Sequence, residues 1–231
     1  MRTVMITGGA GGLGQTVSRR FAASGERVII VERSLDKAQA LVDELSGSHL
    51  ALSADLSDAA QVEAMLCEAI AKVGSIDVLV HTVGGFAMGQ PVHETDIELW
   101  ERMMNINARS LFITAGQVAK HMLEMGVQGK IVAILAKPGA KGAAKMAAYS
   151  ASKAAAQRII ESMALELRGH GINVNGVVPS IIDTPANRKD MPNADFSKWV
   201  TPDQLADAIQ YLTSDAASAV HGMALEVFGG V

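Results

Sequence analysis

Two hydrophobic periods alternate along all 231 residues of the chain. Short runs rich in β-branched apolar residues are separated by longer segments whose apolar positions recur every three to four residues, the spacing of one helix face. Strands that are apolar on both sides and are joined through helices are typical of a parallel sheet covered by helices on both faces. The pattern therefore predicts an α/β fold with a doubly wound parallel sheet.

Seven strands and six helices are expected, and nothing between them resembles a linker, so one domain spans 1–231. The strands are predicted at Thr3 to Ile6, Arg27 to Glu32, His49 to Ser53, Val78 to His81, Lys130 to Leu135, Asn173 to Val178 and Ala224 to Phe228. The helices are predicted near Leu13 to Ser24, Leu35 to Leu45, Ala59 to Val73, Ile97 to Met125, Ala147 to Arg168 and Pro202 to Leu212. The segment Ser180 to Val200 has no clear period, and a loop of that length usually carries function.

Composition narrows the class of protein. Apolar residues make up 49% of the chain and charged residues 19%, which is enough for a large core and excludes a disordered composition. The net charge of −4 gives no basic face for nucleic acid or for an anionic membrane. No apolar run approaches membrane-spanning length, and the first strand runs directly into glycine without a signal-peptide segment. A soluble, cytoplasmic protein is expected.

Cysteine and histidine usage argues against metal or disulfide chemistry. The single cysteine, Cys67, cannot form an internal disulfide, and we expect it to be a small buried residue of its helix. The six histidines are scattered without the spacing of metal ligands, so no metal site is expected. His81 closes a strand, where a buried, hydrogen-bonded structural histidine is more common than a catalytic one.

The first chemical motif runs from Thr7 to Gly14, between a predicted strand and a predicted helix. Backbone N–H groups at a helix start face an anion, and glycines allow a pyrophosphate to approach closely. Two glycine spacings fit this segment, the dinucleotide pattern Gly9, Gly11 and Gly14 and a looser pattern Gly8, Gly12 and Gly14. The context favours nucleotide binding over a purely structural tight turn.

Residues after the next strands would choose and hold the nucleotide. Glu32 ends the second strand, where a carboxylate accepts hydrogen bonds from the adenosine ribose and repels a 2′-phosphate, so NAD(H) is favoured over NADP(H). Arg33 could instead receive that phosphate. Asp55 and Leu56 are placed to reach the adenine, although an aspartate there could also cap the next helix, a role that suits Asp58 better.

Tyr149 and Lys153 lie four residues apart in a predicted helix and therefore on one face of it. An ammonium beside a phenol lowers the tyrosine pKa from about 10 toward values useful for acid–base catalysis. The alternative is an exposed pair on an amphipathic helix. Asn107 is a poor helix former inside another predicted helix. It could hold a water near the site, or it could simply be solvated.

These motifs together resemble the short-chain dehydrogenase/reductase family. Thr7 to Gly14, Asn107, Tyr149 to Lys153 and Pro179 to Thr184 occur in the order and at roughly the separations of that family, and the resemblance spans the whole chain. It implies a Rossmann-type sheet in the order 3-2-1-4-5-6-7 and a nicotinamide cofactor. It also implies that Tyr149 donates a proton, that Lys153 binds the nicotinamide ribose and lowers the tyrosine pKa, and that Asn107 supports a proton relay.

The resemblance further implies a set of cofactor contacts. They are Gly8, Gly11, Gly12, Leu13, Gly14, Glu32, Arg33, Asp55, Leu56, Val83, Gly84, Tyr149, Lys153, Pro179, Ile182 and Thr184. Family members usually assemble through the helices that carry Asn107 and Tyr149, so a homodimer or homotetramer is expected.

One position departs from the family pattern. A serine normally lies thirteen residues before the tyrosine and holds the substrate carbonyl, whereas this chain has Ala136. Loss of a comparable oxyanion donor costs about 2.7 to 4 kcal/mol. The dihydropteridine reductase branch of the family lacks that serine, and the chain resembles it at Gly84 to Phe86, at Ala136 and Lys137, and from Asp183 to Trp199. Asn107 does not fit that branch.

The leading hypothesis is an NAD(P)H-dependent reductase of a conjugated imine or carbonyl, with quinonoid dihydropteridine as the best single substrate. Such an electron-poor ring accepts hydride without a serine on an isolated carbonyl. One alternative is a generic carbonyl or 3-oxoacyl reductase in which Ser180 or Thr184 replaces the missing hydroxyl. Another is a catalytically silent nucleotide-binding protein.

Overall fold

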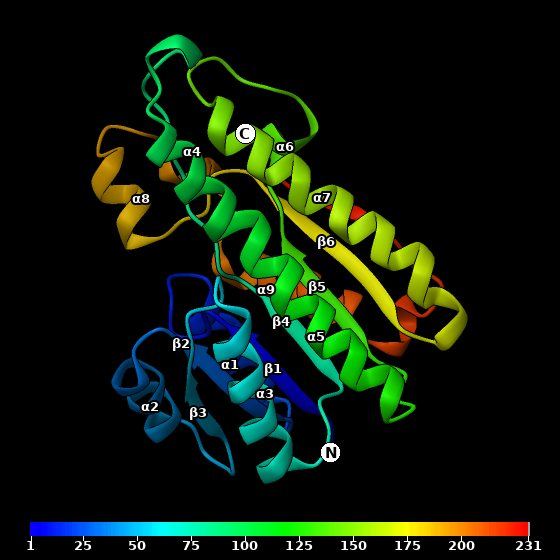
Figure 1. The fold of residues 1–231 in the computed structure, drawn as a ribbon. Helices are drawn as coiled ribbons and strands as arrows, with labels where there is room; N and C mark the ends of the chain where they lie inside the picture. The colour runs from blue at the N-terminus through cyan, green and yellow to red at the C-terminus, as the bar shows by residue number, and fades with distance from the viewer. Residues whose placement is uncertain (231) are drawn as a thin grey trace.

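Seven parallel strands form one sheet in the order β3-β2-β1-β4-β5-β6-β7 in the computed structural model, which describes residues 1–230 (Figure 1). The strands are β1 Thr3–Thr7, β2 Arg27–Glu32, β3 Leu50–Ser53, β4 Val78–His81, β5 Lys130–Ile134, β6 Asn173–Pro179 and β7 Ala224–Val227. The Rossmann-type fold and the strand order implied by the family resemblance are confirmed. Successive strands are added toward one edge from β1 to β3 and toward the other edge from β4 to β7, so the strand order reverses between β1 and β4. Open sheets of this kind bind ligands at that point.

Helices cover both faces of the sheet. Figure 1 shows α3, α5 and α7 in front of it, while α1, α2 and α9 pack on the other face. The main helices are α1 Gly14–Ala23, α2 Leu35–Glu44, α3 Ala59–Val73, α4 Ile97–Met103, α5 Ser110–Glu124, α7 Ala147–Leu167 and α9 Pro202–Leu212. Alternate strand residues feed two separate cores, so Met5 packs on one face while Val4 and Ile6 pack on the other. None of the helices within residues 1–230 is long and apolar enough to cross a membrane.

Three predicted segments differ from the structure. The single helix expected from Ile97 to Met125 is divided by a π-helical segment, Met104–Arg109, between α4 and α5. The loop expected from Ser180 to Val200 contains the short helix α8, Pro185–Asp190, and a 3-10 turn. A further short helix, α6 Lys137–Ala140, follows β5. Hydrophobic periodicity does not reveal such short or locally unwound elements, since each involves about one helical turn.

The prediction for Cys67 is wrong, because the side chain is exposed. The buried positions of α3 are Val62, Met65, Leu66 and Ala69, and Cys67 lies outside that stripe. Asp58 caps α3 by accepting hydrogen bonds from two backbone N–H groups, as predicted. Within residues 1–230, no group of three or more His, Cys, Asp or Glu side chains is placed to hold a metal ion.

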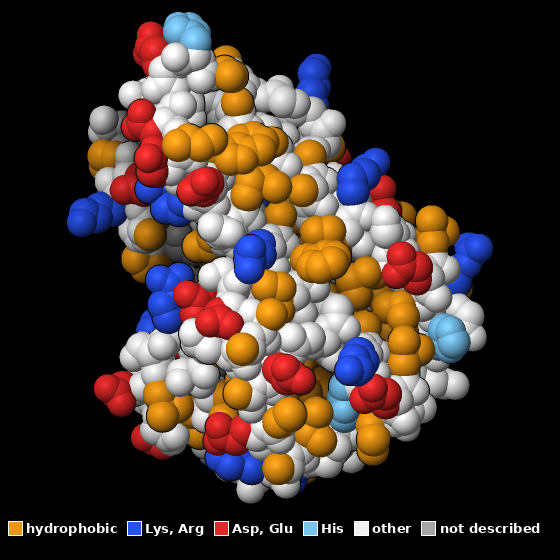
Figure 2. Space-filling model, in the orientation of Figure 1, with side chains coloured by type: hydrophobic (Ala, Val, Ile, Leu, Met, Phe, Trp, Pro, Cys, Tyr) orange, Lys and Arg blue, Asp and Glu red, His pale blue; other side chains and the backbone are white. Residues whose placement is uncertain are grey.

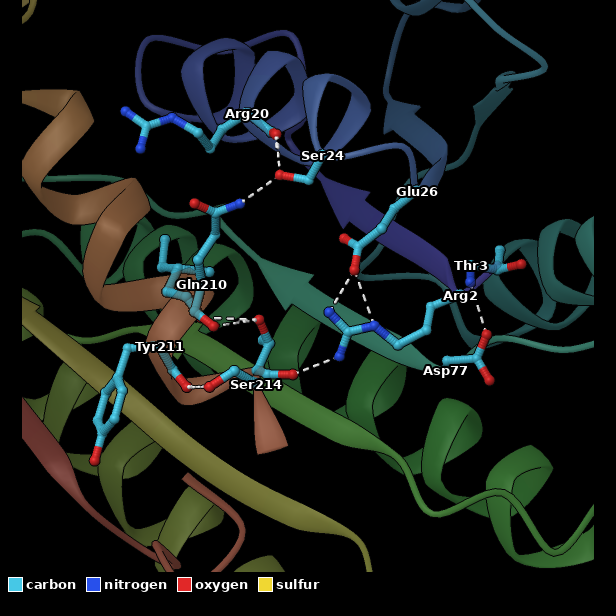
Figure 3. A network of polar contacts seen from close by, with 11 residues as sticks. Arg2, Thr3, Arg20, Ser24, Glu26, Asp77, Gln210, Tyr211 and Ser214 are labelled. Carbon is cyan, nitrogen blue, oxygen red and sulfur yellow. Dashed lines mark hydrogen bonds and ion pairs between the residues drawn. The ribbon is translucent and has the colours of Figure 1, made fainter. Parts of the chain in front are cut away.

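A polar network joins the amino ends of the strands to α9 (Figure 3). The Arg2 guanidinium pairs with Glu26 and donates to the Thr213 carbonyl at 2.6 Å. The backbone N–H of Thr3 donates to the Asp77 carboxylate at 2.7 Å. Because these contacts lie at the amino ends of the strands, they fix the ends of the sheet that lie away from the ligand-binding edge.

Two buried histidines make the fold sensitive to acid. His81 is joined to the Thr7 hydroxyl at 2.9 Å, and burial, with Lys153 nearby, lowers the pKa of His81 to about 3. His121 accepts the Ile76 N–H at 3.2 Å, and burial lowers the pKa of its imidazole too. Below pH ~6.5 the unfolded chain therefore binds more protons than the folded chain. The free energy of unfolding decreases as the pH is lowered through this range.

We expect His81 to lower the free energy of unfolding by up to about 1.4 kcal/mol per pH unit as the pH drops below ~6.5, and His121 to add a loss in the same direction. The loss from His81 continues toward the folded-state pKa of about 3. Urea denaturation at pH 7, 6 and 5 measures it, and His93→Gln, at an exposed histidine, should leave the slope unchanged. A urea midpoint that is constant from pH 7 to 5 would contradict the neutral buried imidazoles.

Candidate active site and cofactor groove

A groove of about 800 Å³ lies at the carboxyl ends of β1 to β4, between the β2–α2 turn and α4. Figure 2 shows it as a hollow at the left margin of the molecule. Six of the predicted cofactor residues line it: Gly8, Glu32, Arg33, Asp55, Leu56 and Val83. Parallel strands bring their carboxyl ends to one edge, which explains why residues so far apart in sequence share one wall.

The glycine turn after β1 is tightly folded. Gly8 has a φ of +71°, a conformation that favours glycine, and its carbonyl accepts the Gly11 N–H at 2.9 Å. A Cβ on Gly14 would lie 2.0 Å from the Gly8 oxygen, so only glycine fits where the turn enters α1. Gly8 and Gly14 are therefore required by the turn itself.

Gly12 has a different role from its neighbours. It is exposed, and a Cβ there would meet the Thr184 methyl group at 3.2 Å. Any residue larger than glycine would therefore fill the gap between the glycine turn and Thr184. A turn that a pyrophosphate must approach needs that gap to stay open. The Leu13 side chain packs in the core, so its possible contribution is limited to the backbone. The turn fits a dinucleotide.

Two carboxylates of the groove are already hydrogen-bonded by the protein. One Glu32 oxygen accepts the Ala10 N–H at 2.8 Å, and the Lys37 ammonium lies 3.7 Å from the same oxygen. The Ser57 hydroxyl and backbone N–H donate to Asp55 and hold the pKa of that carboxyl below its usual range. Each carboxylate keeps its second oxygen free to accept a hydrogen bond from a ligand.

Tyr149 and Lys153 both lie on α7, as predicted, but their electrostatics differ from the prediction. Within residues 1–230, the Lys153 ammonium donates to the Ile134 carbonyl at 2.8 Å and makes no hydrogen bond to the phenol. Burial lowers the pKa of Lys153 to about 8 and raises that of Tyr149 to about 12. The ammonium that was expected to lower the tyrosine pKa is held by the Ile134 carbonyl instead, and desolvation is what raises the pKa of the phenol. Tyr149 is a protonated phenol at neutral pH.

The Tyr149 ring also packs edge-on against Phe86, with ring centroids 5.0 Å apart. Phe86 follows Gly84 and Gly85 in the turn after β4. A Cβ on Gly84 would lie 3.1 Å from the Lys153 ammonium, so the backbone passes directly beside that group. The turn after β4 and the start of α7 thereby form one wall of the candidate active site.

Asn107 connects these two parts of the site. Its carbonyl oxygen accepts the Gly85 N–H at 2.9 Å, and its amide nitrogen donates to the Gly85 carbonyl and to the Ser152 hydroxyl, each at 3.0 Å. The Ser152 hydroxyl donates in turn to the Tyr149 carbonyl. Asn107 is 2% exposed, so the alternative of a solvated helical asparagine is wrong. In the structure, the Asn107 amide holds the backbone of Gly85 through two hydrogen bonds.

We expect Asn107→Ala to destabilise the protein by about 2 to 4 kcal/mol, because it leaves the half-buried N–H and carbonyl of Gly85 without their partner and removes the donor to the buried Ser152 hydroxyl. The Gly85 amide should also exchange its hydrogen faster. Urea denaturation and hydrogen exchange measure these effects, and Asn193→Ala, at an exposed asparagine, is the control. An Asn107→Ala protein with unchanged stability and unchanged exchange at Gly85 would show that the amide does not hold the turn.

The two hydroxyls that the sequence suggested as replacements for the missing serine differ in their hydrogen bonds. Ala136 lies two residues after β5, directly before α6, and is 7% exposed, and its methyl group cannot form a hydrogen bond. The Ser180 hydroxyl donates to the Phe228 carbonyl, and the Thr184 hydroxyl accepts the Asn187 N–H as the cap of α8. The Ser180 proton is thus bound to backbone, whereas the Thr184 hydroxyl only accepts and keeps its own proton.

The remaining predicted contacts belong to the segment after β6. Pro179 is the last residue of β6, and Ile182 pairs with Val200 in an isolated bridge. That bridge closes the base of the segment that carries α8. Thr184 of this segment borders the glycine turn at Gly12, and none of the three residues Pro179, Ile182 and Thr184 lines the groove.

Sequence reasoning missed one whole wall of the groove. Five residues of α4 and the π-helical segment line it: Glu98, Glu101, Arg102, Asn105 and Ile106. Their spacing of three, four and seven residues is that of one helix face. That stripe was visible in the sequence, but only the fold shows that it faces the cavity.

Comparison with known proteins identifies the family. Residues 2–195 match the short chain dehydrogenase family model. D-threitol dehydrogenase of Mycolicibacterium smegmatis is 31% identical over 99% of this chain and 92% of its own, and cis-4-hydroxycyclohexanecarboxylate dehydrogenase of Sinomonas cyclohexanicum is 34% identical over 99% and 96%. The crystal structure of 3-ketoacyl-(acyl-carrier-protein) reductase from Brucella melitensis complexed with NADH superposes with a TM-score of 0.89 at 29% identity, over 99% of this chain and 97% of that one. The chain belongs to the short-chain dehydrogenase/reductase family and is an NAD(P)-dependent oxidoreductase.

Proposed function

We propose that this enzyme reduces a conjugated imine or carbonyl, with quinonoid dihydropteridine as the best single substrate. The observation that carries the proposal is the buried alanine at position 136, where the family has its serine, together with the Ser180 hydroxyl, which donates to the Phe228 carbonyl. An isolated ketone would lack one of the two groups that polarise its oxygen. A conjugated ring spreads the developing charge and does not need that donor.

Tyr149 and Lys153 are the proposed catalytic residues. The phenol, protonated at neutral pH because burial raises the pKa of Tyr149 to about 12, donates a proton to the substrate. A dihydronicotinamide bound there would supply a hydride and Tyr149 a proton, so the acceptor would gain two electrons and two protons in total. Lys153, held by the Ile134 carbonyl, provides a positive charge beside Gly84 and is the proposed ligand of the nicotinamide ribose.

Phe86 supports a planar substrate. Its ring is 63% exposed although it packs edge-on against Tyr149. An exposed aromatic face next to the proton donor suits a flat heterocycle, since offset or edge-on ring contacts stabilise such pairs by about 0.5 to 1.5 kcal/mol. Asn107 fixes the turn that carries Phe86, and we propose that it positions this ring rather than taking part in the proton transfer itself.

We also propose that NADH is the preferred cofactor. Glu32 keeps one carboxylate oxygen free at the carboxyl end of β2, where it would accept hydrogen bonds from the adenosine ribose hydroxyls. Its charge disfavours a 2′-phosphate at the same place.

The generic carbonyl reductase makes a different prediction for Ala136→Ser. If the enzyme normally reduces conjugated rings, the new hydroxyl should change dihydropteridine turnover by less than about threefold, because no carbonyl oxygen there requires it. A generic reductase should instead gain about tenfold or more in ketone turnover, with dihydropteridine remaining a poor substrate. Steady-state kinetics of the wild type and Ala136→Ser, each with dihydropteridine and with a ketone, separates the two functions.

A catalytically silent nucleotide-binding protein is the third candidate. The assembled contacts of Tyr149, Lys153 and Asn107 argue against it, because a site without chemistry does not require a buried ammonium or a clamped aromatic turn. Cofactor binding without turnover across a broad panel of ketones, imines and dihydropteridines would support it.

We propose a homodimer or homotetramer assembled through α5 and α7. Phe112 on α5 and Leu165 on α7 are each 65% exposed, so both helices present large apolar side chains outside the fold. Light scattering coupled to gel filtration measures the mass. A monomeric protein at micromolar concentration would contradict this assembly.

A further inference from the structure

Helix α8, Pro185–Asp190, lies in the segment 183–199 between β6 and α9 and has no buried residue. Figure 1 shows it at the left margin, outside the two layers of helices that cover the sheet. A helix of six residues is too short to be stable by itself, because its first turn fixes many dihedral angles for few hydrogen bonds. Specific side-chain contacts must therefore hold α8 in its place.

Arg188 makes two such contacts at once. Its guanidinium donates to the Asp183 carboxylate through two hydrogen bonds, at 2.5 and 2.8 Å, which hold the pKa of that carboxyl below its usual range. Its central carbon lies 4.6 Å from the centroid of the Phe196 ring. A planar guanidinium can place its edge on a carboxylate and its face on a ring. The Asn187 side chain also donates to the Ile182 carbonyl at 2.8 Å, but that contact reaches only one end of the segment.

Both partners of Arg188 are fixed to the body of the protein. The Asp183 N–H donates to the carbonyl of Val200, which is fully buried, at 2.8 Å. The Phe196 ring packs against Trp199 with ring centroids 4.8 Å apart, and Trp199 is only 4% exposed. Arg188 therefore joins α8 to both ends of its segment.

The segment that Arg188 holds borders the glycine turn. Thr184 caps α8 by accepting the Asn187 N–H, and its methyl group would lie 3.2 Å from a Cβ on Gly12. Contacts that fix α8 therefore also fix the side chain opposite the place where a pyrophosphate would approach the helix start.

We propose that Arg188 is a positioning residue that holds the segment 183–199 against the glycine turn and thereby slows the release of the bound nicotinamide nucleotide. The inference rests on the proposed nicotinamide-dependent reduction but not on the identity of the acceptor. Arg188 acts through α8 and Thr184 rather than on the reacting atoms. Because the protein's own side chains hold the segment, the nucleotide does not have to order it on binding, which lowers the cost of binding.

The direct test measures two rates in Arg188→Ala. We expect the amide hydrogens of residues 185–190 to exchange about tenfold or more faster. Bound NADH, or NADPH if the wild type binds it more tightly, should dissociate about tenfold faster in stopped-flow displacement. The urea midpoint should not change, because α8 has no buried residue. Single-turnover reduction of dihydropteridine at saturating nucleotide should change by less than about threefold, because Tyr149 and Lys153 are untouched.

Two further variants and one control refine the test. Arg188→Lys keeps the charge but not the two-pronged, stacked geometry, so both rates should rise to intermediate values. Phe196→Leu keeps an apolar side chain but removes the ring, and it should raise both rates even if Arg188→Ala proves insoluble. The control is Arg19→Ala, at an exposed arginine of α1 that pairs with Glu44, and both rates should match those of the wild type.

The outcomes separate this inference from the proposed function. Wild-type exchange over 185–190 in Arg188→Ala would show that the residue does not hold α8, and faster exchange with unchanged nucleotide release would show that the segment does not retain the nucleotide. Equal changes in Arg19→Ala would assign the effect to surface charge. Each of these results overturns the inference alone. A wild type that binds nucleotide without reducing dihydropteridine overturns only the proposed substrate, and one that binds neither nucleotide overturns both. Faster exchange together with faster release, with the control unchanged, supports the inference.

Discussion

Replacing Tyr149 by phenylalanine is expected to lower kcat for the reduction by about 10²- to 10⁴-fold, the range of contributions of a positioned general acid. The phenol is protonated at neutral pH, because burial raises the pKa of Tyr149 to about 12, so the wild type always holds the proton that the reaction consumes. Phenylalanine cannot supply it. Steady-state kinetics with dihydropteridine and NADH measures the loss.

The fold should survive this change. The edge-on contact with Phe86 depends on the ring and not on the hydroxyl, so the free energy of unfolding should change by less than about 1 kcal/mol. Tyr211→Phe, at an exposed tyrosine of α9, is the control and should keep full activity. Activity of Tyr149→Phe within tenfold of the wild type would mean that water or another group donates the proton.

The second large effect is expected from Gly14→Ala in the first turn. The new Cβ would lie 2.0 Å from the Gly8 carbonyl oxygen and 2.9 Å from the Gly9 Cα, and backbone cannot move aside as a flexible side chain could. We expect a loss of about 3 kcal/mol or more in the free energy of unfolding, or insoluble protein. Gly116→Ala on α5 is the control, because nothing lies within 4 Å of a Cβ there. It should be neutral or slightly stabilising.

Gly12→Ala separates folding from binding in the same turn. Its Cβ would meet only the Thr184 side chain, so stability should stay within about 0.5 kcal/mol of the wild type. The cofactor should nevertheless bind about tenfold or more weakly, because the methyl group occupies the approach to the helix start. Isothermal titration with NADH measures this loss. A soluble, stable Gly14→Ala protein, or Gly12→Ala with unchanged NADH affinity, would contradict these roles for the two glycines.

Features that depend on local geometry could be predicted from the sequence. Strand positions agree to within one or two residues, since buried parallel strands are short, β-branched and bounded by helices. The glycine turn follows from the need for a backbone without Cβ atoms beside Gly8. The position of Tyr149 and Lys153 on one helix follows from their spacing alone.

Features that depend on tertiary contacts could not. The stripe from Glu98 to Asn105 reads as a solvated helix face until the fold places α4 over the groove. The Tyr149 pKa depends on burial by neighbours such as Phe86, which no spacing rule contains. Cys67 was misplaced because its local segment is apolar, although the buried stripe of α3 passes beside it. The hydrogen bonds of the Ser180 and Thr184 hydroxyls also depend on the fold, because Phe228 is distant in sequence and Asn187 lies in helix α8, which the sequence did not predict.

Single-turnover mixing of the purified protein and NADH with quinonoid dihydropteridine tests the central claim most directly, with a simple ketone and a 3-oxoacyl thioester as competitors. A site with alanine in place of the serine at position 136 should oxidise NADH at least about a hundredfold faster with the conjugated ring than with either isolated carbonyl. Equal rates with all three substrates, or faster reduction of the ketone or thioester, would contradict a reductase that works without the serine.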